Sequence, residues 1–177
     1  MLQTAYEYPG PALVRYPRGA GIGTEVGTDL DTVPWGRAAR VREGDAVALL
    51  VFGTLLGSAL TVAERLDATV VNMRFVKPLD AETVRSVAAT HRLLVTLEEN
   101  VVQGGAGSAV NELLHASGIQ VPVLNLGLPD RFIEQATQAE QLEEAGLSVE
   151  QIERRIRDAL AGFGLEAASL GRSAEQR

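Results

Sequence analysis

The fold of this chain is indicated by residues 71–110, which contain VNMRFVKPLD (71–80), LLVTLEEN (93–100) and VVQGGAGSAV (101–110). In order, they read as a strand, a turn marked by Pro78, a helix, a strand, a pair of acids and a glycine-rich turn that opens another helix. This alternation is typical of an open α/β sheet. Such sheets usually bind ligands and partners beyond the carboxyl ends of their strands, where the polar groups of this stretch stand.

The same alternation continues on both sides of this stretch. Short apolar runs predict strands, and helical spacing and capping signals predict the helices between and after them. The predicted strands are 47–52, 69–73, 93–97 and 121–126, and the predicted helices begin near Leu56, Asp80, Ala106, Thr137 and Ser148. Pro122 places the last strand at a sheet edge or at its entry. The order predicts a three-layer α/β/α domain with a mostly parallel sheet.

The first part of the chain does not fit this domain. Residues 12–16 are a short strand candidate that Pro17 ends, with a helix end before it. One strand and a helix end cannot bury a core, so we expect them to belong to a sheet supplied by another domain. Glycines dominate the next segment, which predicts an interdomain linker over the surface. The predicted division is 1–19, a linker of 20–44, a domain of 45–164 and a frayed tail of 165–177.

Composition and charge limit the function classes. The chain has 177 residues, of which 46% are hydrophobic, and its formal net charge is −7. An acidic chain of this size fits one globular domain and lacks the basic surface that binds nucleic acid or an anionic membrane. The absence of cysteine excludes disulfides and thiolate metal sites and fits a reducing compartment such as the cytoplasm. No apolar run approaches the ~18–20 residues that cross a bilayer.

Arg18, in RYPRG at residues 15–19, is the first candidate for binding. It follows a predicted strand end, after the rigid Pro17 and before Gly19, which permits close backbone approach. A guanidinium there can hold a phosphate by charge-assisted hydrogen bonds of roughly 1.5–3 kcal/mol each. The residues alone leave a second interpretation open, a salt bridge at a domain boundary.

Paired acids, Glu98 and Glu99, follow the third predicted strand. Such a pair can act as acid and base or hold a metal. No further carboxylate or histidine stands nearby, so bonds to backbone amides or to a basic partner are favoured. The glycine-rich turn at 104–108 opens a helix, whose N-terminus attracts anions. It matches neither the dinucleotide nor the P-loop pattern, which favours close packing as its purpose.

The remaining polar residues carry weaker signals. Arg74 and Lys77 follow the second predicted strand and are candidates for anion contacts or for the solvated flanks of a turn. His91 and His115 fall at predicted helix ends or surfaces with no matching nucleophile, which predicts structural roles. No Ser-His-Asp triad and no metal-ligand spacing is present in the sequence.

The chain closely resembles the C-terminal part of the 1-deoxy-D-xylulose-5-phosphate synthases, a transketolase-like family that depends on thiamine diphosphate. The resemblance covers nearly all of residues 1–163 and is carried by RYPRG, NMRFVKPLD, LVTLEEN, GGAGSAVNE and NLGLPDRFIEQ, in this order. It implies that residues 1–19 end a pyrimidine-binding domain and that a transketolase-type C-terminal domain follows. The family condenses pyruvate with glyceraldehyde 3-phosphate, with loss of CO2, for isoprenoid precursor, thiamine and pyridoxal biosynthesis.

This resemblance assigns one site residue. Arg18 matches the family arginine that holds the phosphate of the aldehyde, whereas Gln135 stands where many relatives have histidine and receives no role. The family's magnesium motif, the glutamate that activates the cofactor ring and the catalytic histidines would all lie upstream. The chain alone is therefore expected to bind neither thiamine diphosphate nor Mg2+ and to be catalytically silent. It would supply assembly surface and one wall of the substrate pocket in a cytoplasmic homodimer.

Two other interpretations remain at this stage. One is a free-standing module for anion binding or dimerisation, in which the turn at 104–107 holds the anion. The other is the equivalent domain of a 2-oxo-acid dehydrogenase subunit, because single motifs such as GGAG also occur there.

Overall fold

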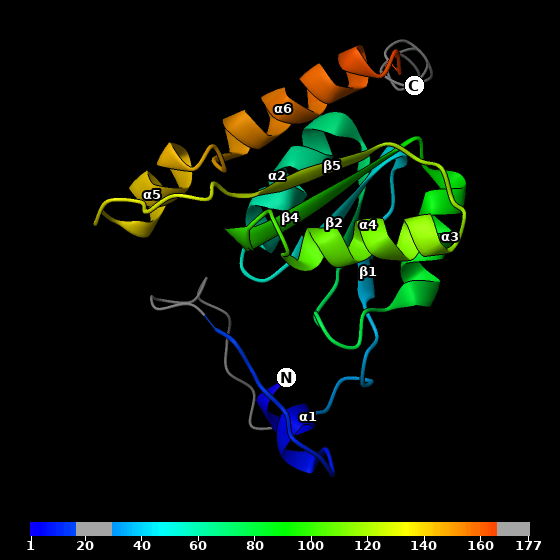
Figure 1. Ribbon diagram of the computed structural model, residues 1–177, viewed down its shortest axis with the longest axis vertical. Helices are drawn as coiled ribbons and strands as arrows, with labels where there is room; N and C mark the ends of the chain where they lie inside the picture. Colours follow the sequence, from blue (N-terminus) through cyan, green and yellow to red (C-terminus); the bar gives the residue numbers. More distant parts are fainter. Residues whose placement is uncertain (17–29, 166–177) are drawn as a thin grey trace, which may run out of the picture.

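The computed structural model describes residues 1–16 and 30–165. Its centre is a five-stranded sheet in the order β1-β3-β2-β4-β5 (Figure 1). β1 runs antiparallel to β3, and all other neighbours are parallel. The strands are β1 (Ala39–Arg42), β2 (Asp45–Phe52), β3 (Ala68–Asn72), β4 (Leu93–Val101) and β5 (Val123–Leu128). The helices are α1 (Leu2–Glu7), α2 (Leu56–Leu66), α3 (Ala81–Thr90), α4 (Ala106–Ala116), α5 (Gln138–Glu144) and α6 (Val149–Gly162).

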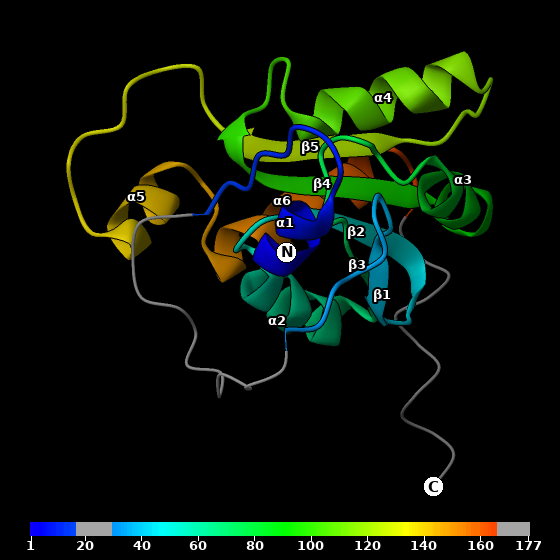
Figure 2. The same ribbon diagram turned by 90° about the horizontal axis from the view of Figure 1, so that it is seen from below.

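Helices cover both faces of the sheet. α2 and α6 pack on one face, and α3 and α4 pack on the other (Figure 2). Successive side chains of a strand point to opposite faces, so Leu49 faces the first pair of helices and Leu50 the second. Both are fully buried. The predicted three-layer architecture with a mostly parallel sheet is confirmed.

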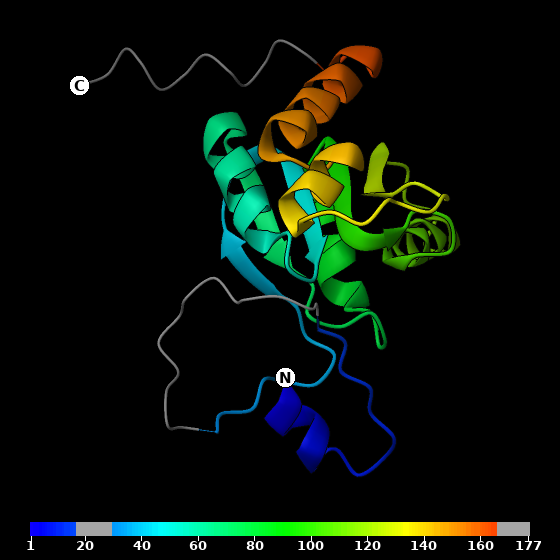
Figure 3. The same ribbon diagram turned by 90° about the vertical axis from the view of Figure 1, so that its left-hand side faces the viewer.

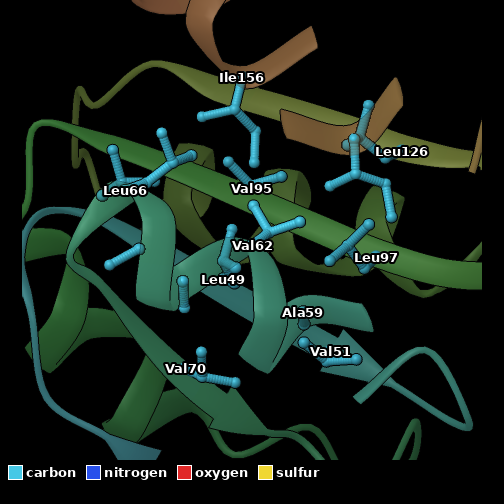
Figure 4. Packing of buried hydrophobic residues seen from close by; sticks show 14 of the residues in the cluster. Leu49, Val51, Ala59, Val62, Leu66, Val70, Val95, Leu97, Leu126 and Ile156 are labelled. Atoms are coloured by element: carbon cyan, nitrogen blue, oxygen red, sulfur yellow. The ribbon is translucent and has the colours of Figure 1, made fainter. Parts of the chain in front are cut away.

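The larger of the two cores lies between the sheet and the layer of α2 and α6. In Figure 4, Leu49 and Val95 of the central strands lie against Val62 of α2 and Ile156 of α6. All four side chains are fully buried. These aliphatic contacts belong to the apolar core that holds α6, the last described helix, on this face of the domain.

Local capping signals act as the sequence predicts. Asp80 caps α3, because its carboxylate accepts a hydrogen bond from the Thr83 amide at 3.0 Å. Thr137 and Glu140 form a capping box at the start of α5. A second box at Ser148 and Gln151 begins α6. β5 is an edge strand, as Pro122 indicated.

One element differs from the prediction. Ala39–Arg42 form β1 inside the segment predicted as a linker, paired with β3 through Ala39 opposite Asn72. Ala-Arg-Val-Arg alternates apolar and charged residues, but a run of four is too short to indicate a strand without the free edge of β3. Residues 12–16 belong to no sheet within the described chain, and their pairing in a sheet supplied by another domain stays a prediction. The division at residues 19, 44 and 164 stays a prediction, and most of the predicted linker and tail lies outside the described residues.

The N-terminal arm, residues 1–16, contains α1 and the segment after it. Figure 3 shows α1 at one end of the molecule, apart from the helices that cover the sheet. Several of its apolar side chains are exposed, including 86% of Tyr6 and 90% of Leu13. No described helix has both the length and the apolar character needed to span a membrane.

Candidate functional site

The candidate site lies at the edge of the sheet where the parallel strands β2 to β5 end. Because parallel strands share their direction, the segments that follow them meet at this edge. Thr54 follows β2, Arg74 follows β3, and Glu98 and Glu99 stand near the end of β4. The sequence therefore brings its polar groups together as predicted, although each plays a different part.

Glu98 is a buried cap for α4. Its side chain is only 1% exposed, and its two carboxylate oxygens accept hydrogen bonds from the amides of Ala106 at 2.7 Å and Gly107 at 2.8 Å. These amides belong to the first turn of α4, which has no partners for them within the helix. The negative charge also complements the positive end of the helix dipole. The favoured interpretation, bonding to backbone amides, is confirmed for Glu98.

This cap also explains the glycine-rich turn. A Cβ on Gly107 would lie 2.5 Å from Thr96 Oγ1 and 2.6 Å from Asn125 Nδ2, so only glycine lets α4 approach the sheet so closely. The amides at the helix start are already taken by Glu98. Close packing is therefore the purpose of the turn, and the idea that its first helical amides hold an external anion is wrong.

Glu99 points to the opposite side and joins three segments. Its carboxylate accepts hydrogen bonds from the Thr54 hydroxyl at 2.5 Å and the Thr54 amide at 3.3 Å. Gln138 at the start of α5 donates to it at 3.5 Å. Its backbone carbonyl accepts a hydrogen bond from the Arg15 guanidinium at 3.1 Å. Glu99 thus links the turn after β2 to α5 and to the N-terminal arm.

Arg74 has the most unusual backbone at this edge. Its φ is +57°, and the amide of Phe75 donates to the carbonyl of Met73 at 2.5 Å, which closes a γ-turn around Arg74. The Asn72 side chain supports the turn by accepting from the Arg74 amide at 3.2 Å. A γ-turn with positive φ is strained for a residue with a side chain, and such strain is concentrated at functional sites. Within residues 1–16 and 30–165, nothing pairs with the Arg74 guanidinium.

Three aromatic rings, called here the aromatic clasp, lie beside that turn. Tyr8 and Trp35 stack with ring centroids 3.9 Å apart and planes 4° apart, and Trp35 meets the edge of Phe75 at 5.3 Å. Each such pair contributes roughly 0.5–1.5 kcal/mol beyond its buried area. Sequence reasoning missed the clasp, although Trp35, the chain's single tryptophan, stands in an otherwise polar, glycine-rich segment and could have signalled it.

A shallow hollow of about 600 Å3 lies next to the turn at 104–108. Lys77, Gln103 and Glu112 bring polar groups to its wall. The hollow is open, and its walls come from the segment after β3, the end of β4, the glycine-rich turn and α4. Lys77 was a candidate for an anion contact. The negative charge of Glu112 on the same wall opposes the binding of an anion there.

Other predicted residues have mixed outcomes. Arg18 and its immediate neighbours fall outside the described residues, so its phosphate role stays a prediction. The two ring nitrogens of His91 lie 2.9 Å from the Val87 carbonyl and 2.8 Å from the Thr69 hydroxyl, at the end of the sheet away from the candidate site. This fits its predicted structural role. Within the described part of the chain, no three acidic, histidine or cysteine side chains gather as metal ligands.

Comparisons with known proteins agree with this geometry. A family model described as "Transketolase, C-terminal domain" matches residues 36–152. The 1-deoxy-D-xylulose-5-phosphate synthase of Bordetella petrii is 57% identical over 89% of this chain and 25% of its own length. The enzyme of the same name from Chromohalobacter salexigens is 59% identical over 89% of this chain and 24% of its own. The chain thus spans about a quarter of the curated relatives it matches.

Solved structures show the same fold. A split-gene transketolase, determined as an inactive β4 tetramer, superposes with a TM-score of 0.69 at 32% identity, over 78% of this chain and 46% of that one. A transketolase mutant from Pichia stipitis matches with a TM-score of 0.50 at 13% identity, over 74% of this chain and 20% of that one, and supports the fold alone. The sheet order, the helix layers and the match over residues 36–152 together establish that the chain belongs to the family of transketolase C-terminal domains.

Proposed function

We propose that this chain acts as the C-terminal part of a 1-deoxy-D-xylulose-5-phosphate synthase. The whole enzyme would condense pyruvate with glyceraldehyde 3-phosphate, with loss of CO2, and its product would feed isoprenoid precursor, thiamine and pyridoxal biosynthesis. The observation that carries the proposal is the identity of 57–59% to synthases over 89% of the chain. The same identity favours a synthase over a 2-oxo-acid dehydrogenase subunit.

The chain would contribute assembly and one wall of the substrate pocket. Its N-terminal arm exposes Tyr6 and Leu13, side chains that a neighbouring domain would normally cover. The split-gene transketolase gives a precedent, since that protein was determined as a tetramer without activity. We infer that the partners are the upstream domains and a second copy of the whole enzyme. A homodimer in the cytoplasm, without nucleic acid or membrane, belongs to the same proposal.

We infer that thiamine diphosphate and its Mg2+ bind outside the residues described for this chain. The buried Glu98 has both of its oxygens bonded to the α4 amides, and no cluster of metal ligands lies within residues 1–16 and 30–165. In the proposed enzyme, the upstream domains hold the cofactor and carry the reaction centre.

What this chain can supply is positive charge for the phosphate of the aldehyde. The sequence resemblance makes Arg18 a candidate for binding this phosphate. The strained turn makes Arg74 a second candidate. Arg15 adds a third guanidinium, held by the Glu99 carbonyl close to the same edge. Arg15 and Arg74, which lie near the carboxyl ends of parallel strands, would be well suited to grip a phosphate by charge-assisted bonds.

A chimera tests this proposal. This chain would replace the matching quarter of the Bordetella petrii synthase, and the rate of formation of the five-carbon sugar phosphate would be measured. We expect an active enzyme, and we expect the 177-residue chain alone to be inactive and to bind no thiamine diphosphate in calorimetry. A well-folded but inactive chimera would contradict the proposal, as would activity of the chain alone.

Arginine variants of the chimera test the phosphate grip. Loss of charge-assisted bonds worth about 1.5–3 kcal/mol should raise the KM for glyceraldehyde 3-phosphate about 10- to 100-fold in Arg18→Ala and in Arg74→Ala. The KM for pyruvate should change less than about twofold. Arg85→Ala, on α3 and bonded to Ser117, is the matched control and should leave both values unchanged. Equal effects on the two substrates would remove the phosphate role.

A further inference from the structure

The aromatic clasp joins two parts of the chain that are distant in sequence. Tyr8 belongs to the N-terminal arm, Trp35 to the segment before β1, and Phe75 to the turn after β3. Trp35 contacts both of the other rings. It therefore connects the arm directly to the turn that presents Arg74.

The arm is held to the domain in three places. The Thr4 hydroxyl accepts a hydrogen bond from the Val33 amide at 2.9 Å, two residues before Trp35. Tyr8 stacks on Trp35 itself. Farther along, Arg15 donates to the Glu99 carbonyl at 3.1 Å. The clasp thus fixes the beginning of the arm, and the arm carries Arg15 to the same edge as Arg74.

The other side of the clasp bears on the strained turn. Phe75 is 5% exposed, and its amide provides the hydrogen bond that closes the γ-turn around Arg74. Packing that fixes the Phe75 ring therefore restricts the backbone that carries this amide. Gly36 brings the Trp35 segment against the same loop, since its φ is +68° and a Cβ there would lie 2.7 Å from Pro78 Cγ.

Core filling does not explain the clasp. Tyr8 remains 38% exposed and Trp35 37% exposed, and neither ring belongs to one of the two hydrophobic cores, whose strand residues are almost fully buried. Its geometry is nevertheless well defined, with planes only 4° apart. Aromatic pairs have preferred geometries, so the stack and the edge contact restrict how the three segments are oriented. The contribution of the clasp is therefore one of position.

We infer that Trp35 is a positioning residue, which fixes the Arg74 turn relative to the N-terminal arm so that Arg74 and Arg15 converge on one phosphate group. This inference rests on the proposed function for the identity of the phosphate. The coupling of Trp35 to the turn concerns the fold alone and is measurable in this chain by itself.

The coupling is tested by amide hydrogen exchange in the 177-residue chain. Trp35→Ala should speed exchange of the Phe75 amide at least about tenfold, because opening of the turn no longer requires separation of the rings. Exchange of the Val110 amide in α4 should stay within about twofold. Trp35→Phe keeps a stacking ring and should restore most of the protection. Unchanged exchange at Phe75 in Trp35→Ala would overturn the inference, as would an equal increase at Val110.

The functional consequence is tested in the chimera. Trp35→Ala should raise the KM for glyceraldehyde 3-phosphate about 5- to 20-fold, with kcat and the KM for pyruvate within about twofold, and Trp35→Phe should recover the original KM. Gly36→Ala keeps the indole, but the added Cβ would push the segment that carries Trp35 away from Pro78, so this variant should reproduce the effect. An unchanged KM for glyceraldehyde 3-phosphate in Trp35→Ala overturns the inference. So does an equal loss of kcat/KM for both substrates, which would indicate a purely structural role. An inactive parent chimera contradicts the proposed function, and the exchange experiment then decides the coupling alone.

Discussion

The N-terminal arm and the α/β domain satisfy their apolar side chains in opposite ways. In the domain, Leu49 and Leu50 are fully buried between the strands and the two helix layers. In the arm, 90% of Leu13 is exposed. The arm contacts the rest of the chain through a few hydrogen bonds and one aromatic stack. The domain therefore completes its own core, whereas the arm presents a surface suited to a neighbour.

The largest test of this contrast compares two leucines. Leu49→Ala should lower the free energy of unfolding by about 4 kcal/mol, because it leaves a cavity in a fully packed core. Leu13→Ala should change it by less than about 0.5 kcal/mol, since an exposed side chain loses few contacts. Urea unfolding followed by circular dichroism measures both values. A loss above about 2 kcal/mol for Leu13 would mean that the arm packs into the domain after all.

The two adjacent acids sharpen the contrast within the domain. Glu98→Ala should cost about 3 kcal/mol, because it removes two charge-assisted bonds and leaves the Ala106 and Gly107 amides unpaired. Glu99→Ala should cost less than about 1 kcal/mol, since its partners remain accessible to water. Equilibrium unfolding in urea compares the two variants. Equal costs would contradict the division between a buried cap and an exposed link.

Asp80 tests the junction between the domain and the segment before β1. Besides capping α3, its carboxylate accepts a hydrogen bond from the Ala38 amide at 2.9 Å. Asp80→Ala should therefore cost about 1–2 kcal/mol at neutral pH.

The same carboxylate makes stability depend on pH. Burial raises the pKa of Asp80, but the hydrogen bonds from Thr83 and Ala38 and the charge of Arg37 together leave that pKa below its usual value. The unfolded chain binds the proton more readily, so this stabilisation is present above about pH 4 and is lost as the pH falls through the lower, folded value. The stability difference between the original chain and Asp80→Asn should accordingly narrow below about pH 4. A constant difference from pH 7 to pH 3 would exclude the carboxylate as its source.

The smallest expected effect concerns the ion pairs between α2 and α6. Glu153 accepts from Arg65 at 3.0 Å and from Arg157 at 2.8 Å, at a partly exposed position. Glu153→Gln should cost about 0.5 kcal/mol, and the cost should fall in 1 M salt. Glu150→Gln is the control, because Glu150 is exposed and lies 3.7 Å from Arg65. A cost above about 1.5 kcal/mol would show that these charges hold α6 more firmly than its apolar face does.

Much of the domain could be predicted from the sequence, because its elements are encoded locally. The apolar run 47–52 and the capping residues Asp80 and Thr137 each specify an element through neighbouring residues. β1 could not be predicted in this way. Its four residues, Ala-Arg-Val-Arg, form a strand only because β3 offers a free edge, and that edge is a property of the assembled sheet.

The candidate site was predictable in part for the same reason. The glycine-rich turn and the paired acids predict a polar edge of the sheet. They do not predict that Glu98 caps α4, because this depends on the close approach of α4 to β4 and β5. The γ-turn at Arg74 has no sequence signature, since a positive φ is unexpected at arginine. The clasp depends on residues 27 and 40 positions apart, from Tyr8 to Trp35 and from Trp35 to Phe75, and local patterns do not report such contacts.

The antiparallel strand β1 has a consequence for how the domain avoids self-association. Without β1, the amides and carbonyls along one side of β3 would be unpaired and could hydrogen-bond to a strand of another protein chain. β1 covers that side of β3, its pairing is irregular between Arg40 and Arg42, and the arginines place charge along the outer margin. Both features discourage a further strand from adding on. A polypeptide that began at residue 45 would keep nearly the whole core but would expose the unpaired edge of β3. We therefore expect β1 to reduce aggregation of the domain.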